Sequence, residues 1–212
     1  MSDGFDLHCR RCPRLAEFLG EVRLKYPDYH ARPVAPFGDS RARLLIVGLA
    51  PGLHGANATG RPFTGDHAGL LLYRTLHAFG FASAPESRAR DDGLRLTGCR
   101  ITNAVKCVPP QNKPVPEEVR TCNRFLRAEL AELKPGAVVL GLGRIAHDAV
   151  LRALDEPPSR MPFVHGQVHE LPGGRRLLDS YHCSRYNTQT GRLTPAMFHA
   201  VFRKVERLLQ AE

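Results

Sequence analysis

The chain has 212 residues, of which 42% are hydrophobic, and a formal net charge of +9. This length suits one domain over residues 1–212 with a buried core. No apolar run approaches the ~20 residues of a membrane span, and the N-terminus lacks the charged-then-apolar order of a signal peptide. We therefore expect a cytoplasmic protein, monomeric and without a membrane partner.

The basic charge comes mainly from arginine, since only five of the 30 basic residues are lysine. A positive balance of this size favours a polyanionic partner, most often nucleic acid. Arginine also suits bidentate contacts with phosphate. The alternative is a genome whose base composition favours arginine codons.

Apolar runs and helical patterns alternate along the chain. The segment 41–50 ends in a buried-strand pattern, and further strands are expected over 100–107, 136–143, 167–171 and 175–182. The expected helices are 67–80, 116–133, 144–154 and 195–210. This alternation predicts an α/β fold with a central, mostly parallel sheet and helices on both faces.

Three polar segments directly follow expected strands, at 48–69, 103–113 and 182–194. Ligands of open α/β sheets bind beyond the carboxyl ends of the strands. We therefore expect these three loops to form one binding edge.

Six cysteines are present, and four of them have spacings that suggest ligation. Cys9 and Cys12 form a CxxC pair, and Cys107 and Cys122 lie 15 positions apart. Four thiolates can bind a 4Fe–4S cluster or a structural zinc ion. The alternative is unligated thiols packed as small apolar side chains. Cys99 and Cys183 lack such spacing and are expected to be free.

The glycine-rich segment 48–69 has neither the P-loop pattern nor G-x-G-x-x-G, which argues against a nucleotide triphosphatase. Phe63 could stack on a flat ligand such as a base, or it could join the core. Asp66 could activate water, or it could cap the following helix.

The other two loops also carry candidate residues. His182 ends the last expected strand and could donate a hydrogen bond to an oxygen that gains negative charge. Around it, Ser184, Arg185, Asn187 and Arg192 have phosphate-binding chemistry. Asn103 ends the motif ITN, and its amide could match the edge of a pyrimidine or serve a turn.

Three ordered segments together resemble the uracil-DNA glycosylase superfamily. They are GLAPGLHGANATGRPFTGDHAG, ITNAVKCVPPQNKP and HCSRYNTQTGRLT. With the four cysteines, the resemblance extends from Cys9 to about Thr194 and is closest to the iron–sulfur-containing family 5 enzymes. It implies a three-layer α/β/α fold and a base that is flipped out of the DNA.

The resemblance also implies a role for each candidate residue. Phe63 would stack on the base, Asn103 would bind its pairing edge, and Asp66 would position or activate the water. His182 would stabilise the departing base. The base-contacting loop would comprise Gly48, Leu49, Ala50, Pro51 and Gly52, and the 4Fe–4S ligands would be Cys9, Cys12, Cys107 and Cys122.

The resemblance implies excision of uracil in base excision repair, by hydrolysis of the N-glycosidic bond. The segment Leu49-Ala50-Pro51 lacks the acidic residue of the sister iron–sulfur family, which implies tolerance of deaminated purines such as hypoxanthine and xanthine. A Cys at position 183 replaces the proline of the usual His-Pro-Ser motif. The alternatives are an iron–sulfur electron carrier and a zinc or iron–sulfur nucleic-acid-binding protein without glycosylase activity.

We also expect Arg61, Arg185 and Arg192, which lie in the binding loops, to contact DNA phosphates. Such contacts make DNA binding strongly dependent on salt.

Overall fold

A computed structural model describes residues 4–210. Its centre is a six-stranded sheet in the order β1-β3-β2-β4-β6-β5. The strands are β1 (Phe37–Gly38), β2 (Leu44–Gly48), β3 (Cys99–Asn103), β4 (Val138–Leu142), β5 (Val168–Leu171) and β6 (Arg175–Ser180). The four inner strands are parallel, whereas β1 and β5 pair antiparallel with their neighbours. The predicted α/β/α class with a mostly parallel sheet is confirmed.

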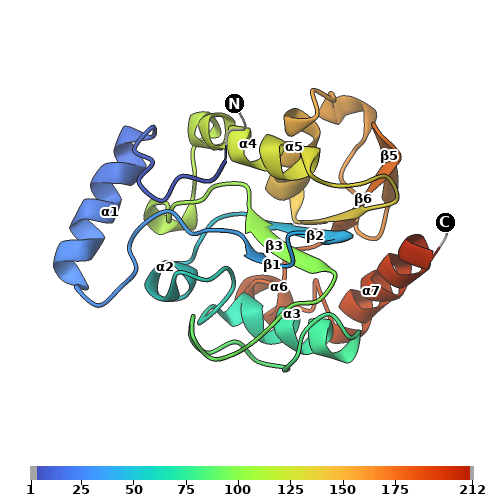
Figure 1. The fold of residues 1–212 in the computed structure, drawn as a ribbon, viewed down its shortest axis with the longest axis horizontal. Coiled ribbons are helices and arrows are strands. Elements are labelled where there is room, and N and C mark those ends of the chain that lie inside the picture. Colours follow the sequence, from blue (N-terminus) through green and yellow to red (C-terminus); the bar gives the residue numbers. More distant parts are fainter. Residues whose placement is uncertain (1–3, 211–212) are drawn as a thin grey trace.

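Helices cover both faces of this sheet (Figure 1). The longer ones are α1 (Pro13–Lys25), α3 (His67–Ala78), α4 (Pro116–Ala131), α5 (Arg144–Ala153) and α7 (Pro195–Gln210), and the shorter ones are α2 (Ala56–Thr59), α6 (Arg185–Gln189) and the 3-10 turns η1 (Pro110–Asn112) and η2 (Pro158–Arg160). Helices α4 and α5 lie on one face, and α3 and α7 lie on the other (Figure 1).

The alternation of side chains along each strand builds the two cores. On β2, Leu44 and Ile46 join the core under α3 and α7, whereas Leu45 and Val47 join the core under α4 and α5. Successive side chains of a strand point to opposite faces, so an uninterrupted apolar run such as LLIVG is needed where both faces are covered.

Several element boundaries differ from the sequence prediction. The strand expected over 100–107 ends at Asn103, and the next two amides donate to the carbonyls of Gly48, the last residue of β2, and of Leu49 in the loop that follows it. Helix α1 was not predicted, although Leu15, Leu19 and Val22 form a buried stripe at helical spacing. The prediction of one domain over 1–212 includes residues outside the described range and stays a prediction.

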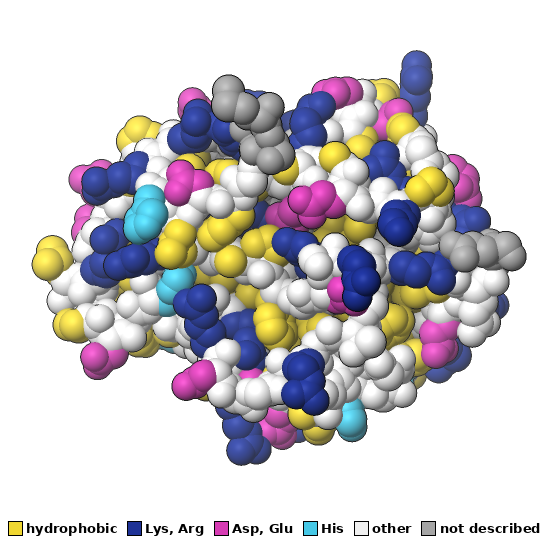
Figure 2. All heavy atoms as spheres, in the orientation of Figure 1, with side chains coloured by type: hydrophobic (Ala, Val, Ile, Leu, Met, Phe, Trp, Pro, Cys, Tyr) yellow, Lys and Arg dark blue, Asp and Glu magenta, His cyan; other side chains and the backbone are white. Residues whose placement is uncertain are grey.

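None of the helices in the described part of the chain is long and apolar enough to cross a membrane. On the face seen in Figure 2, lysine and arginine side chains are spread widely, with acidic side chains between them.

Candidate active site

The three predicted loops meet at one edge of the sheet. Strands β2, β3, β4 and β6 run parallel, and Gly48 is in register with Asn103. A cavity of about 440 Å³ opens there. It is lined by Leu49, Ala50, Gly52, Phe63, Asp66, His67, Ala68, Asn103, Asn112, His182, Ser184 and Arg185. The expected binding edge therefore exists and carries a hollow of ligand size.

An aromatic ring and an amide form the inner part of this cavity. The ring of Phe63 lies 6.0 Å from that of His182, with 26° between their planes. Asn103 is 3% exposed, and its Oδ1 has no hydrogen-bond partner. A Cβ on Gly48 would lie 2.4 Å from Asn103 Oδ1 and 2.6 Å from Phe63 Cζ. The absence of a side chain at position 48 thus lets these two groups occupy the cavity together.

Asp66 directly precedes α3, but its side chain makes no capping hydrogen bond to that helix. Its Oδ2 instead accepts a hydrogen bond from the Ala56 amide, with 3.0 Å between the heavy atoms. A Cβ on Gly52 or on Gly55 would lie 2.1 Å from Asp66 Oδ1. These two glycines therefore make room for the carboxylate, which is turned into the loop and the cavity.

Burial changes the protonation of the two titratable groups in the cavity. It raises the pKa of Asp66, against the opposing effect of hydrogen bonds from the Ala56 and Gly52 amides. Burial also lowers the pKa of His182 to about 4. At neutral pH His182 is therefore a neutral imidazole with one N–H to donate.

The loop after β6 uses part of its polar chemistry internally. Ser184 Oγ accepts a hydrogen bond from the Asn187 amide at 3.4 Å and caps α6. The side-chain amide of Asn187 donates to the His182 carbonyl at 2.8 Å. The Arg192 guanidinium lies 4.8 Å from the centre of the Tyr181 ring. Arg185 is exposed and lines the cavity, so it is the best placed of the four for an extended ligand.

Some of the other residues predicted to bind the base or DNA line the cavity, and others do not. Leu49, Ala50 and Gly52 line the cavity, whereas Gly48 supports it and Pro51 is buried outside the lining. Asn187 and Arg192 are also outside the lining.

Sequence reasoning missed three lining residues. His67 begins α3, and its Nε2 lies 3.2 Å from Thr188 Oγ1. Ala68 follows it, and Asn112 lines the cavity with a positive φ of 56°. The run PPQNKP carried a signal for Asn112, because asparagine tolerates the left-handed region better than most residues.

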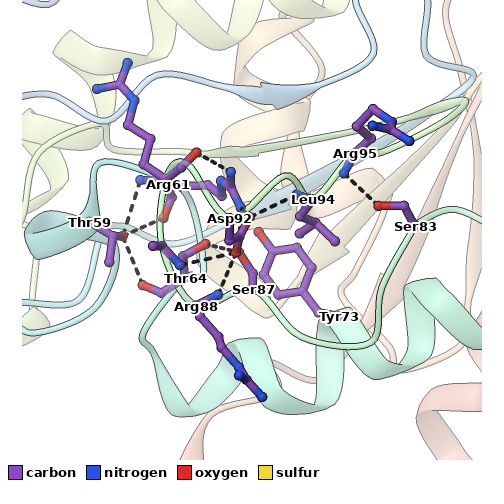
Figure 3. Close-up of polar contacts among 12 residues, drawn as sticks. Thr59, Arg61, Thr64, Tyr73, Ser83, Ser87, Arg88, Asp92, Leu94 and Arg95 are labelled. Carbon is purple, nitrogen blue, oxygen red and sulfur yellow. Dashed lines mark hydrogen bonds and ion pairs between the residues drawn. The ribbon is translucent and has the colours of Figure 1, made fainter.

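The expected phosphate contact of Arg61 is wrong. Arg61 is 5% exposed, and its Nη1 lies 2.6 Å from Asp92 Oδ1 (Figure 3). Its guanidinium also lies over the ring of Phe37, 4.4 Å from the ring centre. These internal partners leave it no path to a phosphate on the surface.

Four cysteines come together on the other side of the sheet from α3. Cys9, Cys12, Cys107 and Cys122 line one small hollow beside α1 and α4. Burial, then the neighbouring Cys122 and other acidic groups, raises the pKa of Cys12 to about 11. Cys99 and Cys183 are buried in the opposite core.

A second cluster of potential metal ligands lies under β5 and β6. His147, His169 and Asp179 hold their ligand atoms within 4.8 Å of one another. His147 is 2.7 Å from Asp179 through Nδ1 and 2.8 Å from the Met161 carbonyl through Nε2. His169 Nε2 lies 3.1 Å from the other oxygen of Asp179. Hydrogen bonds therefore account for the geometry of this cluster.

Comparison with known proteins gives consistent matches. The family model of the uracil DNA glycosylase superfamily matches residues 35–206. A type-5 uracil-DNA glycosylase of Thermus thermophilus is 52% identical over 205 residues, which cover 94% of this chain and 93% of that protein. A type-5 uracil-DNA glycosylase of Pyrobaculum aerophilum is 44% identical, covering 93% and 88%.

More distant similarity extends to a second type. A type-4 uracil-DNA glycosylase of Archaeoglobus fulgidus is 31% identical over 166 residues, which cover 78% of this chain and 69% of that protein. The type-5 matches are thus both longer and closer than this one.

Proposed function

The chain belongs to the uracil-DNA glycosylase superfamily, and we infer that it excises uracil from DNA in base excision repair by hydrolysing the N-glycosidic bond. The observation that carries this inference is the convergence of Phe63, Asn103, Asp66 and His182 on one cavity at the carboxyl edge of the sheet. A base inside a duplex cannot reach such a cavity, so the target nucleotide has to be flipped out of the stack.

We propose that the flipped base binds between the ring of Phe63 and the side-chain amide of Asn103. Phe63 offers one face for stacking. Asn103 Oδ1 is a buried acceptor without a partner, and leaving such an atom unpaired is costly. Uracil supplies an N3–H donor for this oxygen, and its O4 can accept from the amide nitrogen of the same side chain. Leu49 and Ala50 form an apolar wall beside it.

We propose that Asp66 handles the water and His182 the leaving base. When the bond between the sugar and N1 of uracil breaks, its electron pair stays on the base, and the sugar becomes cationic. The water adds to the sugar carbon and gives up one proton to Asp66, whose pKa is raised by burial. The neutral imidazole of His182 donates its N–H to the oxygen of the uracil anion.

We propose that Cys9, Cys12, Cys107 and Cys122 hold a 4Fe–4S cluster. Thiolate is the normal ligand of such clusters. In the described part of the chain, no three of these sulfurs lie within 4.8 Å of one another. A tetrahedral zinc ion with Zn–S bonds of about 2.3 Å would need a tighter group. The cluster would tie the N-terminal segment to Cys107, four residues after Asn103, and so has a structural role.

Substituting one ligand tests this assignment without reference to activity. We expect Cys107→Ala to lower both the iron content of the purified protein and its melting temperature. The matched control is Cys99→Ala, in the opposite core, which should keep its iron. Full iron retention in Cys107→Ala would contradict the assignment.

We further propose that DNA phosphates bind Arg185 and its neighbours, and that the protein acts as a cytoplasmic monomer. We also propose that hypoxanthine and xanthine are accepted as substrates. The lining of the cavity contains no acidic side chain at positions 49–51 that would reject a purine. Uracil has a single ring whereas hypoxanthine and xanthine have two fused rings, but all three have a flat face on which Phe63 could stack.

The test is base excision from duplexes that carry one uracil, hypoxanthine or xanthine, followed by alkali cleavage of abasic sites. We expect the wild type and the surface variant Asp91→Asn to excise uracil at the same rate. Asp66→Asn, which loses the proposed general base, should be at least ~100-fold slower. If Asp66→Asn excised uracil at the wild-type rate, the proposed role of this carboxylate would be wrong. If the strands with hypoxanthine or xanthine stayed intact, the enzyme would be specific for uracil among these bases.

A further inference from the structure

Residues 83–93 form more than a polar connector. They wrap around Arg61, two residues before Phe63 (Figure 3). Arg61 Nη1 donates to Ser87 Oγ at 3.0 Å and to Asp92 Oδ1 at 2.6 Å, and Nη2 donates to the Arg90 carbonyl. The side chains of Arg61 and Asp92 are 5% and 16% exposed. The connector thus holds a buried cation from three directions.

Asp92 is itself fixed by the connector. Its carboxylate accepts hydrogen bonds from the amides of Arg88, Ala89 and Leu94, at 2.8, 3.2 and 3.0 Å. Burial opposes its ionisation, but these bonds together with Arg61 hold the pKa of Asp92 far below its ordinary value. The carboxylate is therefore charged and immobile when it meets Arg61.

Phe63 has a backbone that needs such support. Its φ of 58° lies in the left-handed region, which is rare for a residue with a bulky side chain. Backbone conformations of this kind persist where the surroundings over-determine them, and they occur often at functional sites. A Cβ on Gly69 would lie 1.9 Å from the Phe63 carbonyl oxygen, so α3 presses directly against this peptide.

Both neighbours of Phe63 are also held. The hydroxyl of Tyr73 donates to the Pro62 carbonyl at 2.7 Å. The hydroxyls of Thr64 and Ser87 lie 2.6 Å apart (Figure 3). Ser87 therefore touches the loop at two points, at Arg61 before Phe63 and at Thr64 after it.

We propose that Ser87 and Asp92 are positioning residues for base excision, which act by holding the Phe63 ring against the flipped base. Neither Ser87 nor Asp92 is among the described residues that line the cavity. Their effect on catalysis therefore has to pass through the loop that carries Phe63. The proposal rests on the proposed stacking role of Phe63. Residues 83–93 would then serve catalysis and would not be merely a polar connector between two elements.

A double-mutant cycle tests this, because groups that act through one another are not additive. We expect Ser87→Ala and Asp92→Asn to lower the single-turnover rate on uracil DNA by about tenfold, since small displacements of a catalytic geometry are costly. In a Phe63→Ala background, the same changes should alter the rate less than about twofold. DNA affinity should change little in either case. Equal fold losses in both backgrounds would overturn the proposal.

Controls separate folding from positioning. Ser87→Thr keeps the hydroxyl and should restore the rate, and Arg88→Ala removes an exposed side chain of the same connector and should match the wild type. If Asp92→Asn fails to fold, Ser87→Ala carries the cycle.

The outcomes also separate this proposal from the function itself. If the wild-type protein did not excise uracil, both the proposed function and this proposal would be refuted. A wild-type rate in Phe63→Ala would refute the stacking role and therefore the proposal. A slow Phe63→Ala with additive connector effects would refute the proposal alone.

Discussion

Adding a single methyl group at position 52 should disturb Asp66 without touching it chemically. A Cβ on Gly52 would lie 3.0 Å from Asp66 Cγ and 2.1 Å from its Oδ1, and the second distance is more than 1 Å short of the ordinary contact distance of 3.4 Å. The carboxylate is held by the loop amides, so it must shift by about that amount or the loop must open. A displacement of about 1 Å at a catalytic group can cost roughly 100-fold in rate, and overpacking costs about 1–3 kcal/mol of stability.

The assay is the single-turnover rate of uracil excision by Gly52→Ala, with melting temperatures measured alongside. The matched control is Gly20→Ala in α1, where a Cβ would meet nothing within 4 Å and alanine favours the helix. Gly52→Ala should lose about 100-fold in rate, and Gly20→Ala should lose nothing. Combined with Asp66→Ala, Gly52→Ala should cause little further loss. A wild-type rate in Gly52→Ala would refute the argument that Asp66 needs its glycine-lined place.

Three further predictions follow from charges. Because burial lowers the pKa of His182 to about 4, its ring in the native protein should stay neutral down to about that pH in a histidine NMR titration; titration near 6.5 would contradict a neutral donor. Burial lowers the pKa of His147, but Asp179 raises it, and on balance the pKa is above its ordinary value. The pair should therefore stabilise the fold fully below about pH 6.5 and less as the pH rises through the higher folded pKa. The difference in melting temperature between the wild type and His147→Gln should narrow on the alkaline side, and a constant difference would refute this. Arg185→Ala should reduce the slope of log affinity against log salt by about 0.9 on duplex DNA, whereas Arg207→Ala, at the far end of α7, should leave it unchanged; equal slopes for both would remove Arg185 from the phosphate contacts.

The sequence predicted those features that depend on local patterns. Uninterrupted apolar runs such as 44–48 predict strands that are buried on both faces, and the carboxyl ends of parallel strands have to meet at one edge. The resemblance then identified Phe63, Asn103, Asp66 and His182, all of which line the cavity.

Features that depend on distant partners were not predictable. The burial of Arg61 requires Asp92, 31 positions away, and nothing local distinguishes it from a phosphate-binding arginine. Asp66 occupies the position of a helix cap, but its side chain turns to Ala56 because two glycines leave space there. Strand β3 ends at Asn103, where its partner β2 also ends at Gly48, so the length of one strand depends on the neighbour with which it pairs. Each outcome depends on tertiary contacts that no sequence window contains.

The most direct test of the account is to count free uracil and abasic sites released from a duplex with one uracil, using the purified protein in excess. We expect one uracil and one alkali-labile abasic site per duplex for the wild type, and, at the time when the wild-type reaction is complete, almost none for Asp66→Asn or for a thymine control duplex. A wild type that binds the duplex but releases no uracil, or that nicks the strand without releasing the base, would contradict it.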